Sequence, residues 1–87
     1  MATVWIPSIL QELTQGQTTV DVPGSNVRQV IQNLEAAYPG LKDGLMEDGS
    51  LRPDIAVAVD GELTRLGLLE TVQEDSEVQF MPAIAGG

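Results

Sequence analysis

Three short segments of this chain carry apolar residues in the pattern of β-strands. They are residues 3–6, 18–22 and 77–81, and each is followed directly by a proline. Alternate apolar positions are typical of a half-buried strand, and proline is tolerated mainly where a strand ends or lies at an edge. The pattern therefore predicts three strands with well-defined ends.

A fourth segment, residues 55–59, is a continuous run of Ile, Val and Ala. Such a run is typical of a well-buried strand. Asp60 and Gly61 follow it, a dipeptide that suits the positive φ angles of a tight turn. Residues 63–69 are apolar but interrupted by glycine, and predict either a short strand or a turn.

One segment between the second and fourth strands has the period of a helix. Its apolar positions are Val27, Val30, Ile31, Leu34, Ala37 and Tyr38. Spacings of three and four residues place these side chains on one face of a helix, and polar residues fill most of the other positions. Ser25 or Asn26 can cap the start of this helix, and Pro39-Gly40 ends it.

The remaining segments are predicted to connect these elements. Residues 8–16 look like a turn-containing connection that Gly16 closes. Residues 41–54 are polar and rich in Gly, Asp and Pro, and predict a loop with at most a short turn at 41–46. Residues 70–75 are acidic and predict a surface turn.

Two strands, a helix and two further strands give the order β-β-α-β-β. The economical packing of one helix and four strands lays the helix across one face of a mixed sheet. The sequence therefore predicts an α+β chain with the β-grasp, or ubiquitin-like, fold: a mixed sheet of four to five strands with one main helix on one face. We expect this domain to span residues 1–82 and a flexible tail to span residues 83–87.

Strand alternation also predicts which side chains face the helix. The inward set is Val4, Ile6, Val20, Val22, Val57, Val59, Val78 and Phe80. The opposite face then carries Trp5 and Met81, with no second layer to cover them. An uncovered apolar surface of this kind is a candidate binding surface.

The charge and the missing residue types exclude several classes of function. Thirteen Asp and Glu against four Lys and Arg give a formal net charge of -9, which repels a phosphate backbone and argues against nucleic-acid binding. The acidity favours a partner with a basic face, or serves solubility alone. The sequence holds no His and no Cys, so Ser-His, Cys-His and His-ligated metal sites cannot form. We therefore expect a carrier or substrate protein rather than an enzyme, with no metal site.

Nothing in the sequence indicates export or membrane insertion. The N-terminal residues lack the basic and apolar regions of a signal peptide, and no apolar run approaches the length of a membrane span. The absence of Cys agrees with a reducing compartment. We expect a cytoplasmic location.

Residues 81–87 are mostly small and apolar, and they finish with Gly86 and Gly87. A disordered solubilising tail would be polar, so fraying alone does not account for this composition. Glycine has no Cβ and can thread a narrow channel in another protein. The Gly87 carboxylate, with a pKa of about 3.5, is ionised at neutral pH and must be activated before a nucleophile can displace it. Because Pro82 limits the last strand, the tail should project from the sheet.

These features together resemble one family. The order of elements and the ending Val-x-Phe-x-Pro-Ala-x-Ala-Gly-Gly, residues 78–87, resemble the ubiquitin-like sulfur carriers of the molybdopterin synthase small subunit and thiamin type. The resemblance covers the whole chain. It is closest to the cysteine-biosynthesis branch, through the opening at residues 4–10, the segment at residues 30–40 and the Pro-Ala-x-Ala-Gly-Gly end.

The resemblance implies a cycle of sulfur transfer. An ATP-dependent, ubiquitin-activating-like enzyme would adenylate the Gly87 carboxylate and convert it to a thiocarboxylate, with Gly86 beside it. A downstream enzyme would then take the sulfur: a PLP-dependent cysteine synthase, or next in order the large subunit of molybdopterin synthase. ATP, PLP and molybdopterin would bind these partners, so no cofactor is expected on this chain. The partner-binding residues implied are Leu63, Met81, Trp5, Pro82, Ala83, Ile84 and Ala85.

Two other functions remain open from the residues alone. The same fold and tail suit a ubiquitin-type modifier that is conjugated through Gly87 to lysines of other proteins. They also suit an interaction module that uses only the sheet face.

Overall fold

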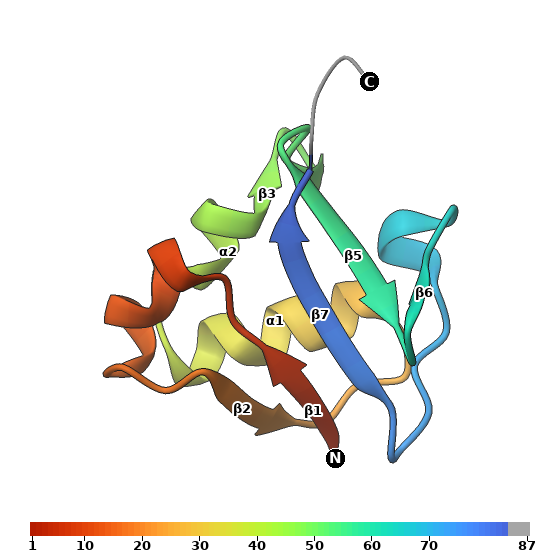
Figure 1. Ribbon diagram of the computed structural model, residues 1–87, viewed down its shortest axis with the longest axis horizontal. Coiled ribbons are helices and arrows are strands. Elements are labelled where there is room, and N and C mark those ends of the chain that lie inside the picture. Colours follow the sequence, from red (N-terminus) through yellow and green to blue (C-terminus); the bar gives the residue numbers. More distant parts are fainter. Residues whose placement is uncertain (84–87) are drawn as a thin grey trace.

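The computed structural model describes residues 1–83, which form a five-stranded mixed sheet with one main helix across one face (Figure 1). The strand order is β2-β1-β7-β5-β6. The strands are β1 (Ala2–Trp5), β2 (Thr19–Val22), β5 (Ile55–Val59), β6 (Glu62–Leu63) and β7 (Glu77–Pro82). Only the central pair β1 and β7 is parallel, and the other three pairs are antiparallel. The predicted mixed sheet with one main helix is thus present.

The main helix, α1 (Val27–Ala37), begins where the sequence offers a cap. Of the two candidates, Asn26 is the cap, because its side-chain oxygen accepts a hydrogen bond from the Gln29 backbone N–H at 2.8 Å. Gly24 precedes it with a φ of +152°, and a Cβ there would lie 2.9 Å from the Val30 backbone nitrogen. The chain therefore needs a glycine where it passes close to the first turn of α1.

The core lies between α1 and the inner face of the sheet. The inward-facing set predicted from alternation is buried, with Val59 the one half-buried member. The strand register brings these side chains together, since Val4 lies between Val20 on β2 and Val78 on β7. The helix contributes Val27, Val30, Ile31 and Leu34 to the same core. Burial of these branched side chains is the main stabilising term for a domain of this size.

Two predicted connections contain more regular structure than the sequence pattern indicated. Residues 8–16 hold a 3-10 helix, η1 (Ser8–Thr14), which ends at Gln15 in the left-handed conformation. The prediction of a loop at 41–54 was wrong in part. That stretch forms a short helix, α2 (Leu41–Leu45), and then a hairpin of β3 (Met46–Glu47) and β4 (Ser50–Leu51).

The hairpin has a clear local cause. Asp48 and Gly49 connect its strands with φ values of 53° and 80°. Two positive φ angles are what a two-residue hairpin turn requires, and Asp-Gly adopts them readily. Asp60 and Gly61, with φ values of 52° and 85°, make the same kind of turn between β5 and β6, as predicted.

The segment after β6 returns along the helix side of the sheet. The sequence predicted either a short strand or a turn at residues 63–69, and both are present. Leu63 ends β6, and a turn of 3-10 helix follows, η2 (Gly67–Leu69). Residues 70–75 are not only a surface turn, because Val72 is buried and its N–H donates to the Ser25 carbonyl at 3.0 Å. The Glu70 carbonyl accepts from the Val27 N–H at 3.0 Å. This segment therefore fixes the N-terminal end of α1.

Within residues 1–83, no helix is long and apolar enough to cross a bilayer.

Candidate functional site

The last described residues of the chain, Pro82 and Ala83, lie at the end of β7 next to the start of β5. β7 runs one residue further than predicted, because Pro82 pairs with Ile55. The next N–H, that of Ala83, donates to the Asp54 carbonyl at 2.8 Å. In this register Pro82 occupies a position that needs no donor, which is where an antiparallel strand tolerates proline. Ala83 is thus positioned by the turn at 52–55.

The predicted reactive residues Gly86 and Gly87, and their neighbours Ile84 and Ala85, lie outside the described residues. The roles assigned to them from the sequence stay predictions. The same holds for the boundary between the domain at 1–82 and the tail at 83–87. The structure gives the position of Ala83, which directly precedes residues 84–87 in the sequence.

The open face of the sheet carries Trp5, Met81 and Leu63, as alternation and the family resemblance predicted. Trp5 is 40% exposed, Leu63 is 68% exposed and Met81 is half-buried. α1 covers only the other face (Figure 1). Their role as partner contacts stays a prediction. The three side chains share one uncovered surface.

Register shows how far apart these three side chains are. Trp5 pairs with Gln79, Gln79 with Ala58, and Ala58 with Leu63, so one row crosses four strands. Three steps between strands place Trp5 and Leu63 about 14 Å apart. Met81 is in the next row, opposite Ala56.

Small side chains lie between the large ones. Ala58 is buried and Ala56 is half-buried on the open face. The surface at these alanines is therefore recessed between the larger side chains of Met81 and Leu63. Such a surface suits a partner's protruding apolar side chain. These alanines were not predicted as part of the open face. Their alternation with the inward-facing Val57 and Val59 would have placed them there.

One end of the open face is acidic. The Trp5 indole Nε1 donates a hydrogen bond to Glu77 Oε1 at 3.0 Å, and the Thr3 hydroxyl donates to Asp21 Oδ1 at 3.0 Å. Both carboxylates are exposed. Glu77 begins the strand predicted at 77–81, and the pairing of β1 with β7 puts its carboxylate beside Trp5.

Asp60 lies where the turn after β5 meets the start of β7, and the pKa of its carboxyl is lowered. The largest cause of this lowering is the hydrogen bond from the Glu77 backbone N–H at 2.9 Å, and the second is the bond from the Ser76 hydroxyl at 2.8 Å. Both bonds favour the ionised form, while desolvation opposes them. Asp60 therefore ties the turn after β5 to the start of β7, the strand that carries Met81 and Pro82.

Among residues 1–83, no group of three or more acidic side chains is placed to hold a metal ion.

The architecture and the open face define a small ubiquitin-like β-grasp protein. The sequence profile of the ThiS family matches residues 4–87, so the chain belongs to that family. The predicted membership of the ubiquitin-like sulfur carriers, and the prediction of a carrier rather than an enzyme, are confirmed at this level.

Two relatives agree with this assignment, one of them over nearly the full length of the chain. The sulfur carrier protein CysO of Mycobacterium tuberculosis is 37% identical over 90 residues, covering 98% of this chain and 97% of the relative. The small archaeal modifier protein 3 of Haloferax volcanii is 37% identical over 65 residues, covering 72% and 71% of the two chains.

Solved structures give the same result. A chain of the BexX/CysO complex of Amycolatopsis orientalis superposes with a TM-score of 0.91 at 34% identity, over 100% of both chains. CysO of Mycobacterium tuberculosis superposes with a TM-score of 0.90 at 34% identity, over 97% of this chain and 100% of that one. The β-grasp fold is thereby confirmed.

Proposed function

We propose that this chain is a sulfur carrier whose Gly87 carboxylate is converted to a thiocarboxylate and then donates its sulfur in biosynthesis. The observation that carries the proposal is the extent of the family match, which includes both Gly86 and Gly87. The full-length relatives named sulfur carriers support it. The end of β7 supports it as well, because Ala83 is fixed by the Asp54 carbonyl only four residues before Gly87.

The chemistry requires a partner enzyme. An ionised carboxylate is a poor electrophile, since a nucleophile would have to expel an oxide. An ATP-dependent enzyme would let a Gly87 carboxylate oxygen attack the α-phosphorus of ATP, with pyrophosphate leaving. A sulfur nucleophile would then attack the acyl carbon of the adenylate, with AMP leaving. This chain would supply the acyl group and its presentation, and ATP would bind the partner.

Cysteine is the destination that we propose first. The support is that relatives matched over nearly the full chain are named CysO, together with the sequence resemblance to the cysteine branch. The sulfur acceptor would then be a PLP-dependent synthase, with PLP on that enzyme. Molybdopterin, formed on a larger synthase subunit, is the next candidate.

The open face is the docking surface in this proposal. Trp5, Met81 and Leu63 would contact the activating enzyme, and the acidic end near Glu77 would face basic side chains on it. Docking through a fixed surface would hold the acyl group in position in the partner's site. Most of the affinity would come from the few large apolar groups and the charges would mainly raise the association rate.

The test is the intact mass of the protein after co-expression with an activating enzyme of its own organism and a sulfur source. We expect a fraction whose mass corresponds to one oxygen replaced by sulfur. Deleting Gly87, or appending one alanine after it, should abolish that fraction, whereas Ile9→Ala on η1 should leave it intact. The proposal fails if the sulfur persists in the variant that lacks Gly87.

One observation favours a second candidate, a protein modifier. The relative from Haloferax volcanii is named a small archaeal modifier protein. A modifier would form an amide between the Gly87 acyl group and lysines of other proteins. Denaturing gels of cell extract discriminate the two: covalent ladders that vanish with Gly87 deletion indicate a modifier, and their absence together with a thiocarboxylate indicates a carrier.

A further inference from the structure

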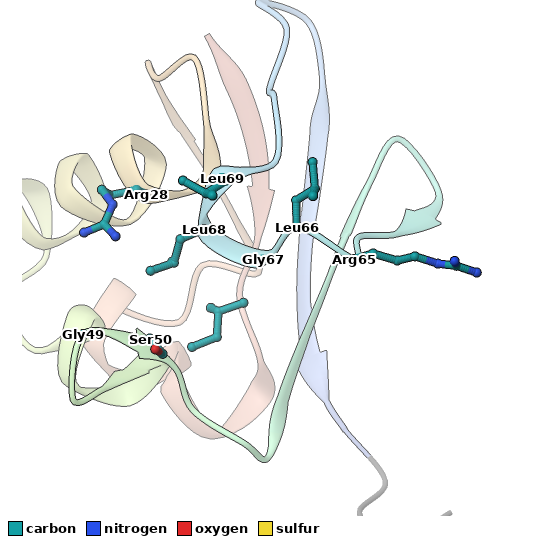
Figure 2. Close-up of a pocket in the computed structure, with 9 residues that line it drawn as sticks. Arg28, Gly49, Ser50, Arg65, Leu66, Gly67, Leu68 and Leu69 are labelled. Atoms are coloured by element: carbon teal, nitrogen blue, oxygen red, sulfur yellow. The ribbon is translucent and has the colours of Figure 1, made fainter.

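A groove lies on the helix side of the molecule, away from the open face of the sheet. It has a volume of about 450 Å³ and runs between the first turn of α1, the β3–β4 hairpin and residues 65–69. Figure 2 shows these three elements around it. Trp5, Met81 and Leu63 do not line this groove, so the docking surface proposed above leaves it unexplained.

Exposed leucines dominate one side of the groove. Leu66 is 60% and Leu69 is 70% exposed, and both line it together with buried Leu68 and half-buried Leu51. Two leucines exposed three residues apart above a buried leucine form an apolar surface that a partner can contact. These exposed leucines were not predicted, because the glycine-interrupted run at 63–69 has neither strand nor helix periodicity.

These leucines are held in place by hydrogen bonds, so their exposure is built into the fold. The Thr64 hydroxyl donates to a Glu70 carboxylate oxygen and accepts from the Leu66 N–H at 3.0 Å. The Glu70 N–H donates to the Gly67 carbonyl at 3.1 Å. A loop fixed in this way does not have to be ordered when a partner binds, which lowers the entropic cost of binding.

A positive charge lies at the other side of the groove. Arg28, in the first turn of α1, lines the groove, and its side chain is exposed. Among residues 1–83 it forms no salt bridge, although the chain carries thirteen acidic residues. In Figure 2 the Leu69 side chain extends towards Arg28, whereas the Arg65 side chain points away from both.

We propose that this groove binds a short acidic segment of a partner protein, with an apolar side chain against Leu66, Leu68 and Leu69 and a carboxylate on Arg28. The guanidinium selects a carboxylate because two parallel N–H groups match its two oxygens. The net charge of -9 repels nucleic acid and anionic lipid surfaces much more than a short peptide with one or two carboxylates, so the exposed Arg28 favours such a peptide over a polyanion. The partner would occupy the side opposite the open face, and so could bind a carrier that is docked on its activating enzyme.

The test is an NMR titration of the full-length, ¹⁵N-labelled protein with three peptides. They are acetyl-Leu-Leu-Asp-Glu-amide, its neutral counterpart acetyl-Leu-Leu-Asn-Gln-amide, and the basic acetyl-Leu-Leu-Lys-Lys-amide. We expect saturable shifts at residues 28, 49–51 and 66–69 with the acidic peptide only, with a dissociation constant of about 1 mM or tighter. The neutral peptide should bind at least about tenfold more weakly, because it loses the charged pair.

Variants separate the groove from other surfaces. Arg28→Gln and Leu69→Ser should each weaken the acidic peptide about tenfold, and Arg65→Gln should not, because that side chain points away. All three positions are exposed, and unchanged melting temperatures would show that the fold is kept.

Three results would overturn the proposal. The first is equal binding of the acidic and neutral peptides. The second is shifts that map to Trp5, Met81 and Leu63 instead of the groove. The third is no saturable binding at all. Loss of the sulfur-carrier function would not affect any of these readouts, since Gly87 takes no part in them.

Discussion

The indole Nε1 of Trp5 donates a hydrogen bond to Oε1 of Glu77, at 3.0 Å, across the parallel pair β1 and β7. The bond fixes the orientation of the ring on the open face while leaving it 40% exposed. An apolar ring and a carboxylate therefore meet within one small area. A partner that fits it should present an apolar group beside a Lys or Arg.

Replacing Trp5 should weaken docking without unfolding the domain. We expect Trp5→Ala to raise the dissociation constant for the activating enzyme by about tenfold or more, since aromatic anchors dominate interface energies. Isothermal titration calorimetry measures this constant. Ile9→Ala is the matched control, because Ile9 is 78% exposed but lies on η1. Equal effects of the two substitutions would show that the open face does not dock.

Neutralising Glu77 should slow association more than it changes dissociation. Glu77→Gln keeps an acceptor for the indole but removes the charge, so we expect the association rate constant at low salt to fall about two- to fivefold. Stopped-flow fluorescence of Trp5, the one tryptophan, follows the binding. Raising the salt should abolish the difference. Glu12→Gln, an exposed charge on η1, should have a smaller effect; the same effect at both positions would indicate attraction by net charge alone.

Gly24 should tolerate alanine much less well than Gly16 does. Both have positive φ values, 152° and 84°, but only at Gly24 would a Cβ contact the Val30 backbone nitrogen, at 2.9 Å. We expect Gly24→Ala to cost about 2–4 kcal/mol and Gly16→Ala about 1 kcal/mol. Urea unfolding measures both. Similar costs would mean that the backbone at residues 23–24 moves aside freely.

Asp60 should contribute to the acid stability of the fold. The Glu77 N–H and the Ser76 hydroxyl lower its pKa below the ordinary value of 3.8, so the folded state binds its proton less readily than the unfolded state. Its stabilising effect is therefore present above pH 3.8 and is lost as the pH falls through the lower folded pKa.

Asp60→Asn should accordingly be less stable than the natural sequence at neutral pH, and its stability should fall less steeply below about pH 4. Asparagine also tolerates the left-handed backbone found at this position, with a φ of 52°. Thermal unfolding followed between neutral pH and about pH 2 measures the difference. Asp75→Asn, an exposed carboxylate on the preceding turn, controls for the loss of one charge. Parallel curves for Asp60→Asn and the natural sequence would contradict the account.

The fold was predictable wherever one residue pattern had one structural meaning. Val4, Val57 and Val78 alternate with outward residues, and the helix from Val27 has an apolar face, so both layers could be derived. The hairpin at 46–51 was missed because its strands have two residues each, too short for a period to emerge. Its Asp48-Gly49 turn was the available signal.

The open face was predictable in composition but not in geometry. Alternation placed Trp5 and Met81 outward, and the family resemblance added Leu63. Their separation across four strands depends on the strand order, which comes from pairing between distant segments. The groove at Arg28 could not be foreseen, since it unites α1, the hairpin and residues 65–69 through tertiary packing alone.

In the proposed cycle Gly87 carries the transferable sulfur. Tandem mass spectrometry of the C-terminal peptide tests this, with protein isolated from its own cells under conditions that preserve thioacids. We expect sulfur to replace one oxygen on the last residue and on no other, and the modified fraction to grow when the downstream acceptor enzyme is removed. A peptide that carries no sulfur in such cells, or carries it at another residue, would contradict the account.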